Sequence, residues 1–258
     1  MSKFPPTTLR QSKGFTLMEL LVVIAIILVL AAIAFPVYTS VRQRSNKAVA
    51  LNAMRQLSSA ASTYSAQNDG ELPREDSKGT DDWIAAADPL NVKAWYNALP
   101  KILGQKSVGE YANFPRDYYT KTNLLYIPGA LYPENDKKLV LPLFAIAINT
   151  KLQRKDADGN KAPVRYMQIS NPAKTVLFLE QGLPDESKSV PTQNKYDGSC
   201  KGSGRSFVGR YGGQGVLTFV DGHSELHDPK DVLTETGRFP FPPEGIHWTR
   251  SADEDPNK

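Results

Sequence analysis

The chain has 258 residues, which is enough for one membrane-spanning helix and one soluble domain. Its formal net charge is +4, and it contains a single cysteine, Cys200. An intramolecular disulfide is therefore excluded. We interpret Cys200, which lies among glycine and serine residues, as a loop thiol rather than a nucleophile.

The first 14 residues are polar and basic, and an apolar stretch follows them. Residues 20–38 carry no charged side chain, which is close to the length of about 20 residues that a helix needs to cross a bilayer core. Glu19 stands at the edge of this stretch. A carboxylate beside a membrane span is costly unless it finds a partner, so Glu19 is a candidate functional residue.

Residues 13–20, Lys-Gly-Phe-Thr-Leu-Met-Glu-Leu, resemble the prepilin cleavage and methylation motif of type IV pilins and type II secretion pseudopilins. The resemblance implies that prepilin peptidase removes a leader, residues 1–14, by cutting between Gly14 and Phe15, and that it methylates Phe15. The match extends through the apolar helix and includes Pro36, where this family commonly carries a helix-kinking proline. Three basic residues precede the cut, so the mature chain is close to neutral and its charge does not indicate nucleic-acid binding.

The same resemblance implies a structural subunit of a type IV pilus-like filament or of a secretion pseudopilus, anchored by one span in the bacterial inner membrane with its domain in the periplasm. Its partners would be other subunits, prepilin peptidase, the inner-membrane assembly platform and the lipid bilayer. Glu19 would neutralise the N-terminal ammonium of a neighbouring subunit. Whether the filament is a pilus or a pseudopilus stays open.

A second interpretation rests on Ala32-Ile33-Ala34, a small-x-small pattern after an apolar run that is typical of a conventional signal-peptidase site. The protein would then be an exported or membrane-anchored periplasmic binding or enzymatic domain that uses residues 13–34 as a signal or anchor. Its mature form would begin at Phe35.

The apolar pattern predicts one long helix. Residues 15–38 are apolar on all sides, as expected for a transmembrane or filament-core helix. Residues 39–68 continue as an amphipathic helix, because apolar residues recur at spacings of three, four and seven. Asn68-Asp69-Gly70 ends the helix, with Gly70 able to take a left-handed cap conformation. Residues 68–73 also resemble the helix end of a large pilin-like family of secreted bacterial subunits.

Residues 69–237 are expected to form a globular α+β domain, in which a small antiparallel sheet packs on the amphipathic half of the helix. Two short helices are predicted at 83–87 and 92–99. The strand candidates, which follow one another without long helices between them, are 139–148, 165–169, 175–179, 215–220 and 224–226. Residues 238–258 are rich in proline and then in acidic residues, and we interpret them as an extended tail.

Residues 209–223 resemble the C-terminal Asp-Gly motif of that pilin-like family, here Asp221-Gly222. The family normally has a histidine ten residues before the Asp-Gly pair, and Tyr211 occupies that position in this chain. The departure puts any role of that histidine in doubt.

Two groups of residues are weak metal candidates. Asp221, His223, Glu225 and His227 alternate, so on a strand they would share one face and offer ligands to a transition metal, although successive side chains are about 7 Å apart and all four would not converge on one ion. Asp156, Asp158 and Asn160 begin a calcium-loop pattern that lacks its closing glutamate. We therefore expect no cofactor, with calcium as the minor alternative. No nucleophile elbow or phosphate loop is present in the sequence, so no enzyme is predicted.

Overall fold

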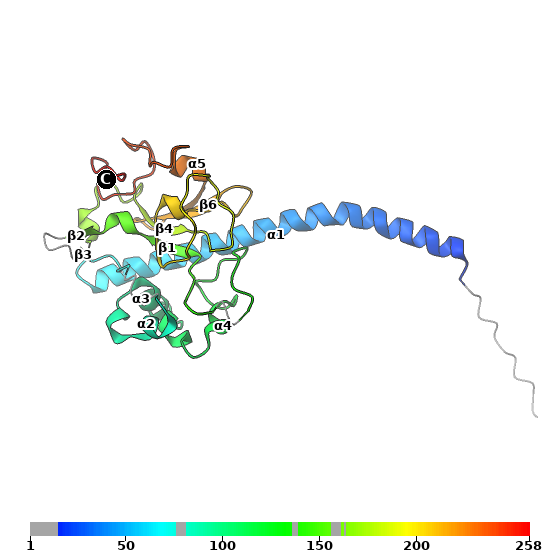
Figure 1. Ribbon diagram of the computed structural model, residues 1–258, viewed down its shortest axis with the longest axis horizontal. Helices are drawn as coiled ribbons and strands as arrows, with labels where there is room; N and C mark the ends of the chain where they lie inside the picture. Colours follow the sequence, from blue (N-terminus) through cyan, green and yellow to red (C-terminus); the bar gives the residue numbers. More distant parts are fainter. Residues whose placement is uncertain (1–14, 76–80, 136–138, 156–160, 163) are drawn as a thin grey trace, which may run out of the picture. The chain divides into compact units, whose positions relative to one another are not determined.

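The computed structural model describes residues 15–75, 81–135, 139–155, 161–162 and 164–258. The chain divides into two compact units, residues 1–43 and 44–258, and helix α1, Leu17–Gln67, belongs to both (Figure 1). The second unit contains short α-helices and 3₁₀ turns, which are α2 (Trp83–Ala87), η2 (Pro89–Asn91), α3 (Trp95–Ile102), η3 (Val108–Tyr111), α4 (Pro115–Tyr118), η5 (Thr150–Leu152), η6 (Tyr166–Gln168), η7 (Gly204–Ser206) and α5 (Pro229–Val232).

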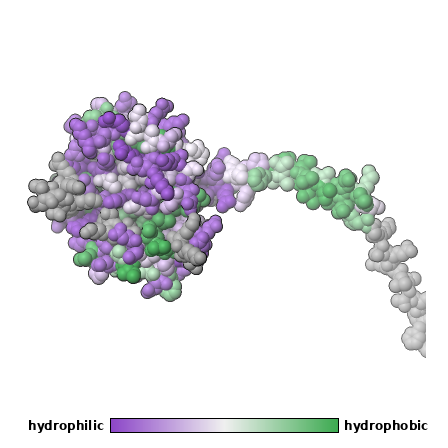
Figure 2. All heavy atoms as spheres, viewed as in Figure 1, coloured by the Kyte–Doolittle hydropathy of each residue, from purple (hydrophilic) through white to green (hydrophobic). Residues whose placement is uncertain are grey.

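The part of α1 in the first unit has no apolar core to pack against. Every described side chain from Phe15 to Gln43 is exposed, and Figure 2 shows apolar residues gathered along this part of the helix. By length and composition, the helix is able to cross a membrane. Pro36 lies inside it, and the carbonyl oxygen of Pro36 accepts a hydrogen bond from Thr39 Oγ1 at 2.9 Å. The segment therefore needs lipid or other apolar helices to cover it.

The end of α1 follows the predicted cap. Asp69 and Gly70 both adopt positive φ angles, 52° and 78°. Gly70 N donates to Ser65 O at 2.9 Å, which is the hydrogen bond that closes a helix with a left-handed residue after it. The chain then turns back, and Glu71 pairs with Arg165 in an antiparallel bridge.

The sheet of the second unit has the order β5-β1-β4-β6-β7. Its strands are β1 (Ile146–Asn149), β4 (Val176–Glu180), β5 (Lys201–Gly202), β6 (Gly215–Phe219) and β7 (Ser224–His227), and a separate hairpin joins β2 (Arg154–Lys155) to β3 (Lys161–Ala162). The predicted α+β class is confirmed, but the sheet is mixed rather than antiparallel. The short edge strand β5 pairs with β1 in parallel, because the long connection after β4 brings the chain back to the opposite edge.

Both faces of the sheet are buried, which explains the continuous apolar runs in β4 and β6. On one face, Met54, Leu57 and Ala61 of α1 join Ile146, Phe178 and the aromatic residues of α3 in the larger core. On the other face, a second core forms, composed of Ala147, Val176, Leu179, Phe207, Leu217, Phe219, Val232, Leu233, Phe239 and Trp248.

Several predicted segments differ from the structure. Of the predicted strand 139–148, only residues 146–148 belong to a strand, β1. Residues 165–169 form the 3₁₀ turn η6 instead of a strand, because Gln168 Oε1 accepts from Arg165 N at 3.0 Å and closes the chain into a turn. Residues 238–258 lack regular secondary structure, but they are not an extended tail. Phe239 and Trp248 are buried in the second core, and Val176 N donates to His247 O at 3.0 Å.

The packing of α1 on the sheet predicts the effect of truncating Leu57, which is fully buried. In a chain that begins near Val41, Leu57→Ala should lower the free energy of unfolding by about 2–5 kcal/mol, because it leaves a cavity. Ser62→Ala, at an exposed site on the same helix, should change it by less than about 0.5 kcal/mol. Denaturant unfolding of both variants provides the measurement. Equal small losses would show that this helix face is not part of the core.

Candidate functional site

The start of α1 is closed by a reciprocal hydrogen-bonded pair. Glu19 Oε2 accepts from Thr16 N at 2.9 Å and from Thr16 Oγ1 at 2.8 Å. In return, Thr16 Oγ1 accepts from Glu19 N at 3.2 Å. This is the geometry of a capping box, which satisfies backbone N–H groups that have no partner within the helix. The spacing Thr-x-x-Glu at residues 16–19 is the sequence signal of such a box.

The capping box fixes where the Glu19 carboxylate lies. It sits at the positive end of the helix dipole, where a negative charge is stabilised. Phe15, directly before Thr16, is 76 % exposed. Gly14 lies outside the described residues. The expected cleavage point therefore lies directly before an exposed aromatic residue, Phe15. The carboxylate of Glu19, four residues further on, already has a local partner in Thr16.

A second group of polar residues is buried in the domain around Arg210. Its guanidinium donates to Glu186 Oε2 at 2.7 Å through Nη2 and to Glu186 Oε1 at 3.2 Å through Nε. It also lies 3.4 Å from Glu180 Oε1. All three side chains are at most 7 % exposed. Sequence reasoning missed this cluster, because its members are separated by up to 30 residues and share no motif.

Tyr211 belongs to the same cluster. Its hydroxyl donates to Glu180 Oε1 at 2.9 Å, and Val216 N donates to Glu180 Oε2 at 2.8 Å. Burial raises the pKa of the Glu180 carboxyl, while the charge of Arg210 acts in the opposite direction. Burial, followed by the Glu180 charge, raises the pKa of Tyr211, so the phenol stays protonated and acts as a donor. At this position Tyr211 is a structural hydrogen-bond donor to a buried carboxylate.

The Asp-Gly motif forms the turn between β6 and β7, as predicted. Gly222 has a φ of 104°, a value that favours glycine. His223 Nδ1 lies 2.6 Å from Asp221 Oδ1, and His227 Nε2 lies 2.8 Å from Glu225 Oε1. These side chains thus form two neighbouring pairs. Within the described part of the chain, no group of three or more His, Cys, Asp or Glu side chains is placed to hold a metal ion.

The calcium candidates Asp156, Asp158 and Asn160 lie outside the described residues. Cys200, expected to be an exposed loop thiol, is instead fully buried in the larger core, where it lies next to the chain segment at Glu75.

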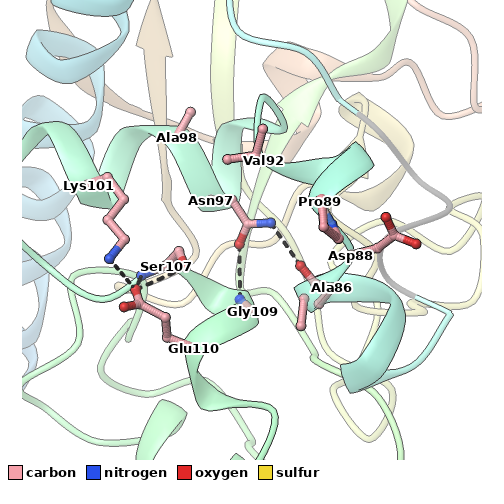
Figure 3. A pocket seen from close by; sticks show the side chains of 11 residues that line it. Ala86, Asp88, Pro89, Val92, Asn97, Ala98, Lys101, Ser107, Gly109 and Glu110 are labelled. Atoms are coloured by element: carbon pink, nitrogen blue, oxygen red, sulfur yellow. Dashed lines mark hydrogen bonds and ion pairs between the residues drawn. The ribbon is translucent and has the colours of Figure 1, made fainter.

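A surface cavity of about 330 Å³ lies between α2, α3 and η3 (Figure 3). Asn97 lines it, and its side chain joins α2 to η3 by donating to Ala86 O at 2.9 Å and accepting from Gly109 N at 3.0 Å. Lys101 Nζ and Glu110 Oε2 are 2.6 Å apart. Asn97 thus bonds to backbone groups and Lys101 bonds to Glu110, which is the arrangement of a structural junction rather than that of a nucleophile with its base.

Comparison with known proteins connects the first of these sites to a family motif. Residues 9–35 match the model of the prokaryotic N-terminal methylation motif. Over 41 residues the chain is 54 % identical to the type IV wide pilus major component PilA4 of Thermus thermophilus. These 41 residues are 16 % of this chain and 31 % of that protein. No solved structure matches the chain.

The match therefore spans less than a third of the length of this relative, and it lies in a short stretch of both chains. The methylation motif covers the segment that contains Phe15, the Thr16–Glu19 capping box and most of the apolar helix. Over residues 9–35 the chain carries a prokaryotic N-terminal methylation motif, and over a stretch of 41 residues it is similar to a type IV pilus component.

Proposed function

We propose that the protein is a structural subunit of a type IV pilus-like or type II secretion pseudopilus filament. The observation that supports this most directly is the methylation motif at the head of a helix whose described side chains from Phe15 to Gln43 are all exposed. Such a surface is unfavourable in water, and both a bilayer and a bundle of identical helices would cover it. The domain that follows has its own apolar core, so it needs neither a bilayer nor a helix bundle to cover it.

In this proposal, prepilin peptidase cuts between Gly14 and Phe15 and methylates Phe15. The subunit then resides in the inner membrane, with its domain in the periplasm. The assembly platform later transfers it into the filament. Pro36 would provide a bendable point at which the apolar helix aligns with its neighbours. No enzymatic activity and no cofactor are part of this function.

The processing step has a direct test. The mature protein from membrane fractions should begin at methylated Phe15, and intact mass with N-terminal peptide analysis would show it. Replacing Gly14 with a bulky or charged residue should block cleavage and leave the leader attached. A mature chain beginning at Phe35 would contradict the proposal and favour an exported periplasmic domain instead.

A further inference from the structure

Two basic side chains flank one aromatic ring on the face of the sheet that α1 does not cover. Lys151 Nζ and Arg205 Cζ each lie 5.9 Å from the centre of the Phe239 ring. Both residues are half-buried. Neither forms an ion pair with any residue that the structure describes. Two cations thus share an apolar surface without a bonded counter-ion.

Hydrogen-bond donors without acceptors gather at the same place. Within the described ranges, Trp248 Nε1 and Arg205 Nε are buried and have no hydrogen-bond partner. The Trp248 ring lies 5.3 Å from that of Phe239. A Cβ atom on Gly204, the residue before Arg205, would lie 2.9 Å from Phe239 Cε1 and 3.2 Å from Trp248 Cζ2. The Trp248 ring therefore packs against Gly204, the residue that precedes Arg205.

At Lys151 the repulsion by Arg205 exceeds the attraction by Asp255. Burial, and then the positive charge of Arg205, lower the pKa of Lys151. Asp255 acts in the opposite direction, but its Oδ1 already accepts hydrogen bonds of 2.9 Å from Asn257 N and from Asn257 Nδ2. Because an indole N–H and a guanidinium are donors only, the side chains at this site cannot satisfy one another. Within the described residues, no acceptor is bonded to Trp248 Nε1 or to Arg205 Nε.

We propose that Lys151, Arg205 and the Trp248 indole form a binding site for a small oxyanion, a phosphate or a carboxylate group. An oxyanion has several acceptor atoms, so it can accept hydrogen bonds from the guanidinium and from the indole while its negative charge offsets that of the ammonium group. The site lies in the second core region, where the C-terminal segment folds over β1 and β4. It is independent of the N-terminal helix and of the filament.

The indole signals of the full chain, purified in detergent and labelled with ¹⁵N, provide the test. The chain has three tryptophans. The indoles of Trp83 and Trp95 already donate to Leu139 O and Cys200 O, both at 2.9 Å, so they serve as internal references. Inorganic phosphate, titrated against chloride at constant ionic strength, should shift the Trp248 signal downfield until it saturates and leave the other two in place. A parallel titration with acetate distinguishes a carboxylate site from a phosphate site.

Variants decide whether the shift comes from this site. Lys151→Gln and Arg205→Gln should each weaken binding by about tenfold or more, as expected for the loss of a charged hydrogen bond. Lys106→Gln is the matched control, because Lys106 Nζ also lies over a ring, 5.6 Å from the centre of Tyr111, but outside the proposed site. Unchanged Trp83 and Trp95 signals show that each variant is folded. A Trp248 signal that responds to neither ion, or equally in all three variants, would overturn the proposal.

Discussion

Glu19→Ala is expected to be cleaved and inserted into the membrane normally, yet to be almost absent from filaments. The reason is the change of surroundings on assembly. In the isolated chain, the carboxylate is held by Thr16 at 2.8 and 2.9 Å. In a filament core it would be enclosed by apolar helices, where a charge without a partner is heavily penalised. Under the proposed function, the ammonium of a neighbouring Phe15 supplies that partner.

Removing one member of a buried ion pair costs about 3–5 kcal/mol, which is enough to disfavour addition of each subunit. Glu19→Gln keeps the size of the side chain and removes the charge, so it should fail in the same way. Glu225→Ala is a suitable control, because it removes an exposed carboxylate of the domain, 51 % accessible to solvent, and should assemble normally.

The measurement is a fractionation of sheared filaments from cells in which each variant is the sole subunit. Membrane levels of the mature protein, determined in parallel, separate failed assembly from failed processing. If Glu19→Ala filaments form at the wild-type level, Glu19 is not an assembly residue, even where the processing test at Phe15 has succeeded.

The features that were predictable from the sequence are those set by local patterns. The helix over 17–67 follows from apolar periodicity, and its end follows from Asp69 and Gly70. The buried strands β4 and β6 are continuous apolar runs, and the β6–β7 turn follows from an Asp-Gly pair. Each of these signals acts over a few residues, so it does not depend on the rest of the fold.

The features that could not be predicted depend on distant partners. The segment after residue 238 was predicted to be an extended tail, because proline and acidic residues dominate it. In the structure, Phe239 and Trp248 pack in the second core, on the face of the sheet opposite α1. The short strand β5 exists only because β1 lies next to it. The alternation of Asp221, His223, Glu225 and His227 suggested a shared face on a strand, but only Glu225 and His227 lie in β7. The alternation did not reveal that His223 would bond to Asp221 and His227 to Glu225.

The buried cluster around Arg210 is the clearest case of such a distant dependence. Arg210 joins the end of β4 to the following loop, since Nη2 donates to Gln181 O at 2.6 Å as well as to Glu186. Glu186 in turn accepts from Leu131 N at 2.8 Å. One guanidinium thus connects three separate chain segments. No local sequence pattern predicts such a connection, although its loss should lower the free energy of unfolding substantially.

Arg210→Met should lower the free energy of unfolding by about 3–5 kcal/mol, because it leaves Glu180 and Glu186 buried without their cation. Arg210→Lys should fall between Arg210→Met and the wild type, since an ammonium keeps the charge but cannot bond two carboxylates in the same fixed fork. The matched control is Arg250→Met. Arg250 pairs with Glu254 at 2.7 Å within one turn of chain, with the glutamate 35 % exposed.

Arg250 is 13 % and Glu254 is 35 % exposed, so solvent screens this pair more than the Arg210 cluster, and Arg250→Met should cost less than Arg210→Met. Urea unfolding of the domain, in low salt and in about 1 M salt, provides the comparison, because salt screens exposed charges over about 3 Å at that concentration and acts far less on buried ones. The Arg210→Met loss should persist in high salt. A loss as small as that of Arg250→Met would show that the buried carboxylates have become protonated or solvated without Arg210, and that the cluster does not hold the three segments together.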